Sequence, residues 1–278
     1  MAEVLHIQCP NCRADDYSLW AEENGFKAVK CKPCGLVYVN PRPSDEMITE
    51  SHKIGMHQGE EGNLNVKARR LPSKVRRYKK IIRDMFGDEI RAGKPLRWLD
   101  VGAGYGEVVE AAAAVLPTGS EASGIEPMAP KAEAAAARGV PVSMKRLEEV
   151  GGGYDVISLI NVYSHIPDFD SFGQMLVDKL KPGGFLFLET GNLAELRSGK
   201  EFPNILVLPD HLVFAGVKQM LQILERLGLT VVEHHKRPVG NLVWTAKTFV
   251  KGLMRGKLRI AFPIFAPYRT VLYKARKN

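Results

Sequence analysis

Four cysteines near the N-terminus have the spacing of a metal site. Cys9 and Cys12 form one C-x2-C pair, Cys31 and Cys34 form a second, and 18 residues separate the pairs. A two-residue gap lets both sulfurs of a pair face one ion, and two pairs supply the four thiolates of a tetrahedral zinc site. Because four ligands close the coordination sphere, the sequence predicts a structural Zn2+.

Two other states of these cysteines are open, namely two disulfides or four buried thiols. The N-terminus lacks a basic stretch followed by an apolar run, so no secretory signal points to an oxidising compartment. Four thiols within 26 residues are also an uneven distribution for a chain of 278. We therefore expect a zinc ribbon over residues 1–43, whose folding depends on the metal.

A glycine-rich turn follows an apolar segment near residue 100. The turn from Asp100 to Gly106 reads D-x-G-x-G-x-G. Glycines at such a turn let the backbone approach a ligand and take positive φ. A dinucleotide fingerprint would read G-x-G-x-x-G, whereas here Glu107 follows the last glycine, a poor neighbour for a pyrophosphate. Glu126 ends the next apolar segment, where a carboxylate can accept both hydroxyls of a ribose.

Four motifs in this order resemble those of class I S-adenosylmethionine-dependent methyltransferases. They are LDVGAGYGE at 99–107, GIEP at 124–127, YDVI at 154–157 and LKPGG at 180–184. The resemblance covers roughly residues 75–235 and implies S-adenosylmethionine as the cofactor. The N-terminal CPNC…CKPCGLVYVNPRPS is similar to a subgroup with an appended zinc ribbon. Members of that subgroup often act in sugar, cell-surface polysaccharide or natural-product biosynthesis.

The resemblance implies a cofactor role for each matching residue. The turn that would line the methionine portion consists of Gly102, Ala103, Gly104 and Gly106. Asp100 would orient this turn or meet the amino group through water, and Glu126 would hold the ribose hydroxyls. Arg146 and Leu147 occupy the region that flanks the adenine, and Asn161 would face the reacting methyl group.

Histidines are the candidates for the acceptor side of the site. NVYSHIPD at 161–168 resembles the family's segment after the fourth strand, with Ser164 in place of a common Glu and His165 retained. PDHLVF at 209–214 resembles a segment that brings a His and its acidic neighbour to the acceptor in sugar methyltransferases. A His with a pKa of about 6.5 suits removal of a hydroxyl proton. We take His211 as the first candidate base with Asp210 as its orienter, and His165 as the second; for both histidines an ordinary structural role is the alternative.

The elements that position these residues alternate from about residue 95. Strands are expected at 97–101, 122–125, 154–160, 185–189, 229–233 and 269–274, and helices at 107–116, 130–138, 172–180 and 217–227. This order predicts right-handed βαβ units in an α/β domain over 95–278. With the resemblance, we expect a doubly wound, mostly parallel seven-stranded sheet. Residues 44–94 would hold a helix from Pro72 and a polar segment around His52 that is either a mobile lid or plain linker.

Composition and charge limit the class of protein and the kinds of partner it can bind. Hydrophobic residues make up 45% and charged residues 25% of the chain, which argues against disorder and against a disulfide scaffold. No stretch of 18 apolar residues occurs, so we expect a cytoplasmic protein without a spanning helix. The net charge is +8, with a basic run at 67–83 and eleven Lys or Arg but no acid at 234–278. Such patches bind nucleic acid, anionic lipid or phosphorylated small substrates, and a solvated helix face is the alternative for the first run; we expect the acid-free tail to favour a phosphate-bearing acceptor.

The sequence therefore predicts methyl transfer to a hydroxyl or amine of a small molecule, in particular a nucleotide- or lipid-linked sugar. We expect O- or N-methylation rather than C-methylation, because sugar C-methyltransferases of this type carry a large further domain. The alternative is an RNA methyltransferase, disfavoured by the missing RNA-binding module; a cofactor-free structural module is the third class. Residues 245–259 form a basic amphipathic pattern that either packs on the sheet, as we expect, or contacts an anionic membrane. The oligomeric state is open.

Overall fold

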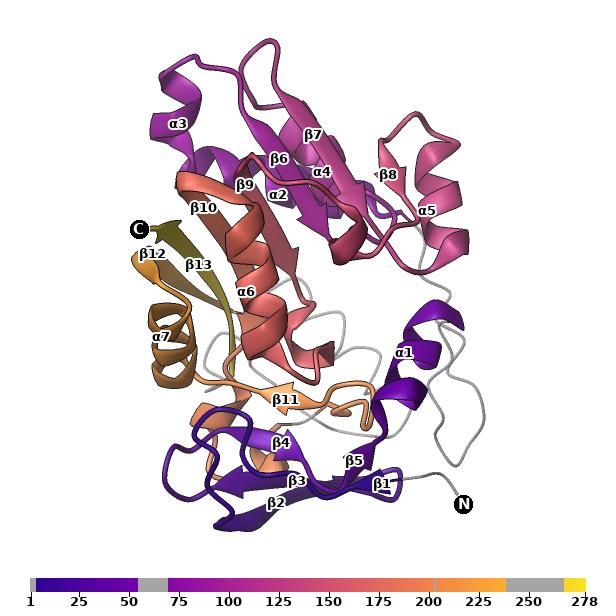
Figure 1. The fold of residues 1–278 in the computed structure, drawn as a ribbon, viewed down its shortest axis with the longest axis vertical. Helices are drawn as coiled ribbons and strands as arrows, with labels where there is room; N and C mark the ends of the chain where they lie inside the picture. Colours follow the sequence, from indigo (N-terminus) through magenta and orange to yellow (C-terminus); the bar gives the residue numbers. More distant parts are fainter. Residues whose placement is uncertain (1–3, 55–69, 203, 239–267) are drawn as a thin grey trace, which may run out of the picture.

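The computed structural model describes residues 4–54, 70–202, 204–238 and 268–278 (Figure 1). Its main sheet has seven strands in the order β12-β13-β10-β9-β6-β7-β8. The strands are β6 (Arg97–Val101), β7 (Glu121–Ile125), β8 (Val142–Ser143), β9 (Tyr154–Ile160), β10 (Leu180–Gly191), β12 (Leu229–Pro238) and β13 (Arg269–Lys277). Neighbours from β10 to β8 run parallel, and β13 is antiparallel to both β10 and β12. This sheet confirms the predicted doubly wound α/β fold.

The order of the strands fixes where a ligand can bind. The chain enters the sheet at β6, moves outward to β7 and β8, and crosses back to β9 and β10 on the other side of β6. Strand order therefore reverses between β6 and β9, and ligands of open α/β sheets bind beyond the carboxyl ends of the strands at such a point. The arrowheads of β6, β7 and β9 point toward the same side of the molecule (Figure 1).

Helices cover both faces of the sheet. They are α2 (Pro72–Met85), α3 (Gly87–Arg91), α4 (Glu107–Ala113), α5 (Ala129–Ala136), α6 (Phe169–Lys179) and α7 (Val217–Arg226). Alternate residues of a strand point to opposite faces. Accordingly, Trp98 of β6 packs in a cluster with α2 and α4, whereas Leu99 belongs to the cluster formed with α6 and α7. The predicted helix start at Pro72 is confirmed.

The cysteine-bearing segment folds as a second, four-stranded sheet in the order β11-β4-β3-β2. The strands are β2 (Tyr17–Glu23), β3 (Phe26–Cys31), β4 (Val37–Val39) and β11 (Val213–Phe214). Asn24 and Gly25 connect β2 to β3 and have φ of 52° and 75°, the positive values that a tight hairpin turn requires. β11 was not expected, and it adds a strand from the methyltransferase-like part of the chain to the ribbon sheet. A further short pair joins β1 (Val4–Leu5) to β5 (Arg42–Pro43).

The region at 44–94 begins with a helix. Asp45–Ile54, at the start of the expected lid or linker, forms helix α1. The Ser44 hydroxyl accepts a hydrogen bond from the Met47 amide at 3.4 Å, and two acidic residues occupy the first turn, so the helix start is stabilised. Within the basic run of α2, Arg77 reaches a buried carboxylate described below.

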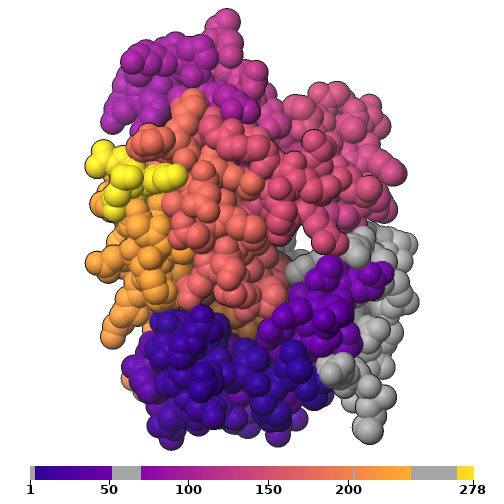
Figure 2. All heavy atoms as spheres, viewed as in Figure 1, coloured from indigo at the N-terminus to yellow at the C-terminus, as the bar shows by residue number. Residues whose placement is uncertain are grey.

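The surface view shows how the two sheets are assembled. The ribbon lies against the main domain, and α1 lies between the ribbon and the region of α5 and β8 (Figure 2). Within the described ranges, every helix is too short or too polar to span a bilayer. The basic pattern at 245–259 and the middle of the expected lid lie outside the described residues.

Candidate active site

The glycine-rich turn follows β6 and takes the backbone shape that the sequence predicted. Gly102, Gly104 and Gly106 have φ of 72°, 53° and 79°. A Cβ at Gly102 would lie 2.5 Å from a methyl carbon of Val162, and one at Gly106 would lie 2.7 Å from Val140, so packing requires both glycines. A Cβ at Gly104 would meet no atom within 4 Å. The middle of the turn therefore faces open space that a ligand can occupy.

Glu126 directly follows β7 and lies beside this turn. Its side chain is buried, and its Oε2 accepts a hydrogen bond from the Gly104 amide at 2.8 Å while Oε1 accepts one from the Met128 amide at 3.1 Å. These two bonds fix the orientation of the carboxylate. Because each carboxylate oxygen has two lone pairs, both can still accept a bond from a hydroxyl.

Asp100 lies under the turn in a buried polar network. The Ser158 hydroxyl donates a hydrogen bond to Asp100 Oδ1 at 2.5 Å and receives one from the Trp98 indole at 2.8 Å. Burial, together with the nearby charges of Glu126 and Glu107, raises the pKa of Asp100 to about 7, although the Ser158 hydrogen bond acts in the opposite direction. This concentration of carboxylates favours a cationic ligand at the turn.

The residues predicted to flank the adenine and the methyl group lie at the ends of β8 and β9. The Arg146 amide donates a hydrogen bond to Glu149 at 2.6 Å at the start of the short helix η1 (Leu147–Glu149). The Leu147 side chain is buried in the main core, so a contact from Leu147 to a ligand would come from its backbone. Asn161 is exposed after β9 with a φ of 57°, and its amide donates to the Glu189 carbonyl at 2.8 Å.

The structure brings the three candidate catalytic residues together. His165 lies in η2 (Tyr163–His165) after β9, and Asp210 and His211 precede β11. Nδ1 of His165 is 3.0 Å from the carbonyl oxygen of Asp210 and 3.1 Å from its Oδ1. Nδ1 of His211 is 2.7 Å from the Leu206 carbonyl oxygen, and the centroids of the two imidazoles are 4.7 Å apart.

These contacts determine which nitrogen is basic. A carbonyl oxygen can only accept a hydrogen bond, so Nδ1 carries the proton in both histidines and Nε2 carries the lone pair. Asp210 was expected to orient His211, whereas this hydrogen bond joins the Asp210 carboxylate to His165. The donor atoms of the three residues lie within 4.8 Å of one another, which would suit a metal ion. Nδ1–H hydrogen bonds of this kind also orient metal-ligating histidines, so the contacts suit either a His165–Asp210 pair or an ion at Nε2.

The cysteine cluster has the geometry of a zinc site. Sγ of Cys9 is 3.5 Å from that of Cys34, Sγ of Cys12 is 3.5 Å from that of Cys31, and all four sulfurs lie within 4.8 Å of one another. A disulfide requires about 2.05 Å, so none of the four is disulfide-bonded. Tetrahedral zinc with bonds of about 2.3 Å would hold the sulfurs about 3.8 Å apart. The hydrogen bond from Cys9 lowers the pKa of Cys34 to about 4, which favours a thiolate there.

A buried glutamate near the end of β10 forms an ion pair that was not expected from the sequence. Glu189 is 1% exposed, and its Oε1 lies 2.7 Å from Nη2 of Arg77, while the Tyr78 hydroxyl donates to Oε2 at 3.3 Å. Glu189 follows the apolar residues of β10, as Glu126 follows those of β7, and that signal was available in the sequence. Arg77 could not be recognised because it lies in a run of exposed basic residues.

Known proteins resemble this chain in sequence and in fold. A family model described as "Methyltransferase domain" matches residues 68–234. A ubiquinone biosynthesis O-methyltransferase of Brucella anthropi is 29% identical over 185 residues, which are 57% of this chain and 74% of that protein. One from a Chelativorans species is 33% identical over 119 residues, 38% of this chain and 46% of its own length.

Solved structures resemble this chain in fold alone. A putative sarcosine dimethylglycine methyltransferase from Galdieria sulphuraria has a TM-score of 0.54 at 14% identity, covering 73% of this chain and 86% of its own. A geranyl diphosphate C-methyltransferase from Streptomyces coelicolor, in complex with S-adenosyl-L-homocysteine, has a TM-score of 0.52 at 14% identity, covering 77% and 86%. The cysteine cluster lies outside the residues that the family model matches.

Proposed function

The chain belongs to the family of methyltransferase domains, and we propose that it transfers a methyl group from S-adenosylmethionine to a hydroxyl or amine of a small molecule. The observation that carries this proposal is the open turn at Gly104 with the Glu126 carboxylate hydrogen-bonded beside it. A turn of this shape at the reversal of strand order is a site for a nucleoside-bearing ligand.

The residues around the turn fit S-adenosylmethionine. Glu126 accepts the ribose hydroxyls, and the backbone of Gly102–Gly106 borders the methionine portion. Because S-adenosylmethionine carries an ammonium and a sulfonium, the carboxylates of Asp100, Glu107 and Glu126 favour it over a pyrophosphate dinucleotide. Residues 146–147 border the adenine, and Asn161 faces the methyl group.

The acceptor side of the proposed reaction needs a base and a positioned hydroxyl. When bound, S-adenosylmethionine supplies a methyl group that is already activated, so orientation of the acceptor provides much of the rate. His165 takes the hydroxyl proton at Nε2, and the Asp210 carboxylate stabilises the imidazolium that forms. His211 lies beside the same ring and borders the acceptor.

We propose that the acceptor is a sugar-like or otherwise hydroxylated compound that bears a phosphate. The net charge of +8 and the exposed Lys74, Arg76 and Arg83 of α2 support an anionic group on the substrate. The sequence relatives with the name ubiquinone biosynthesis O-methyltransferase support a small-molecule acceptor over RNA.

The four cysteines support a structural zinc ion in this proposal. Cys9, Cys12, Cys31 and Cys34 would close its coordination sphere, so the ion would hold the ribbon together without touching substrate. Ligating thiolates persist in a reducing compartment, and we therefore also propose a cytoplasmic location. The proposed division is a ribbon at 1–43, a connecting region at 44–94 and the cofactor-binding domain at 95–278.

Two measurements on the zinc-loaded protein test this function. Titration calorimetry should show binding of S-adenosylmethionine and S-adenosylhomocysteine. Transfer of a labelled methyl group should then be measured to nucleotide-linked sugars, to hydroxylated quinols and to generic RNA. Transfer to either small-molecule class supports the proposal and identifies the acceptor. Absence of cofactor binding, or transfer to RNA alone, would contradict it.

A further inference from the structure

The turn of the β2–β3 hairpin in the ribbon is hydrogen-bonded to a loop of the main domain. Glu23 ends β2, and its Oε2 accepts a hydrogen bond from the Leu206 amide at 2.8 Å while its Oε1 accepts one from the Leu208 amide at 3.0 Å. The side-chain amide of Asn24, in the hairpin turn, donates to the Leu208 carbonyl at 2.8 Å. Two neighbouring side chains thus hold three backbone groups of one short segment.

The segment that Glu23 holds has an unfavourable backbone. Val207 lies between the two amides and has a φ of 63°. A β-branched residue rarely adopts a positive φ, and such a conformation persists only where the surroundings enforce it. The Glu23 carboxylate, bonded to the amides on either side of Val207, is a direct source of that constraint.

The same segment positions the acceptor-side histidines. The Leu206 carbonyl accepts the hydrogen bond from Nδ1 of His211 at 2.7 Å, and the His211 amide donates to the Val207 carbonyl at 3.1 Å. Leu206 is therefore held at its amide by Glu23 and at its carbonyl by His211. Asp210, one residue before His211, carries the carboxylate that contacts His165.

Other ribbon residues hold the chain on either side of this loop. Lys30 Nζ donates to the carbonyls of Ala194 at 2.9 Å and Leu196 at 2.7 Å. β4 pairs with β11 immediately after His211, and the Val39 amide donates to the Leu212 carbonyl at 2.8 Å. The segment from 194 to 214 thus takes much of its support from the ribbon.

We propose that Glu23 is a positioning residue for methyl transfer: it fixes the 206–208 backbone so that Asp210 and His211 are correctly placed around His165. The ribbon then acts as the scaffold of the acceptor site. This inference rests on the proposed function, because its effect is measured as the rate of methyl transfer. Glu23 itself touches neither cofactor nor acceptor in this proposal.

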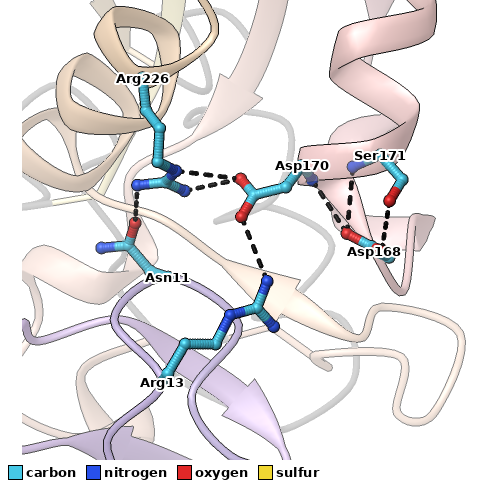
Figure 3. Close-up of polar contacts among 6 residues, drawn as sticks. All are labelled: Asn11, Arg13, Asp168, Asp170, Ser171 and Arg226. Carbon is cyan, nitrogen blue, oxygen red and sulfur yellow. Dashed lines mark hydrogen bonds and ion pairs between the residues drawn. The ribbon is translucent and has the colours of Figure 1, made fainter.

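A separate contact shows that the ribbon is attached to the main domain without Glu23. Asp170 of α6 accepts hydrogen bonds from Arg13 at 3.3 Å and from Arg226 at 2.7 Å, and Arg226 also contacts Asn11 at 3.2 Å (Figure 3). Asn11 and Arg13 flank Cys12, so this network docks the cysteine cluster itself. Loss of Glu23 should therefore leave the ribbon attached.

The test compares Glu23→Gln with Glu22→Gln in the zinc-loaded protein. Glutamine has one acceptor oxygen and an amide that would face the second backbone N–H, so Glu23→Gln loses one bond and gains a repulsion. Glu22 is the adjacent exposed glutamate and serves as the matched control. We expect Glu23→Gln to lower kcat at least ~10-fold and to shift the acid limb of its pH profile. Zinc content and cofactor affinity should change less than about twofold, as should all values for Glu22→Gln.

Amide hydrogen exchange at Leu206 and Leu208 separates this inference from the proposed function. Faster exchange there in Glu23→Gln, with an unchanged kcat, would show a structural contact and overturn the positioning role. A fall of kcat that matches a loss of zinc or of cofactor affinity would overturn it as well. Lack of cofactor binding and of methyl transfer in the unaltered protein would instead defeat the proposed function.

Discussion

The carboxylate of Asp210 lies 3.1 Å from Nδ1 of His165, although 44 residues separate the two in the chain. The contact joins the segment after β9 to the segment before β11. Since β9 borders the reversal of strand order and β11 belongs to the ribbon sheet, the pair stands where the two sheets meet. An imidazole held by a carboxylate at Nδ1 presents Nε2 as a base.

This pairing predicts the order of effects among the candidate bases. His165→Ala should lower kcat by about 10²–10⁴-fold, because it removes the base, and should leave the Kd for S-adenosylmethionine nearly unchanged. Asp210→Asn should also lower kcat, because an amide does not stabilise an imidazolium. The loss should be smaller than in His165→Ala, because the base itself remains. Steady-state methyl transfer and titration calorimetry provide these values. A larger loss in His211→Ala than in His165→Ala would restore the assignment made from the sequence.

Glu126 should control affinity for the cofactor. In Glu126→Ala the ribose hydroxyls lose a charged acceptor, and each charge-assisted hydrogen bond contributes about 1.5–3 kcal/mol. We expect the Kd for S-adenosylmethionine to rise at least ~10-fold in titration calorimetry. Glu133→Ala, an exposed glutamate of α5, is the matched control and should keep its Kd. Equal Kd values in the two variants would remove Glu126 from the cofactor site.

Asp100 should make the free energy of unfolding depend on pH. Burial raises its pKa from 3.8 to about 7, so between these values the folded state binds more protons than the unfolded state. The contribution of Asp100 to the free energy of unfolding therefore falls as pH rises from about 4 to 7, at about 1.4 kcal/mol for each unit of pKa shift as an upper bound.

Urea unfolding of the zinc-loaded protein at several pH values measures this dependence. The side chain in Asp100→Asn cannot ionise. The free energy of unfolding of this variant, relative to that of the unaltered protein, should therefore increase as pH rises and become constant above about pH 7. Asp178→Asn, an exposed aspartate of α6, should follow the unaltered protein. A parallel pH dependence for Asp100→Asn would show that Asp100 ionises normally in the fold.

The sequence was sufficient where the signal is local. β9 forms over the predicted residues because six of its seven positions, all but Asp155, are apolar or small and suit a strand buried on both faces. The glycine turn and Glu126 were likewise predictable from the ends of two apolar strands. β11 was not, because a two-residue strand exists only through its pairing with β4. The contacts of Asp210 with His165 and of Glu23 with Leu206 could not be predicted either, because they join residues far apart in the chain and a local sequence pattern does not show which distant segments meet.

Zinc removal should separate the acceptor site from the cofactor site. Cys12→Ser lacks one thiolate, so its zinc content should fall well below one ion per chain, and thermal unfolding should begin at a lower temperature. Because the ribbon supports residues 194–214, kcat should fall at least ~10-fold. The Gly104–Glu126 contact lies in the main sheet, so the Kd for S-adenosylmethionine should stay within about threefold.

The matched control for this prediction is Lys32→Ala. Lys32 lies between Cys31 and Cys34 but is an exposed surface residue paired with Asp16, and it ligates no metal. Zinc content, kcat and unfolding temperature should therefore stay close to those of the unaltered chain, since exposed ion pairs contribute little. A zinc-depleted Cys12→Ser protein that still binds cofactor and retains full kcat would show that the 194–214 segment keeps its shape without the metal.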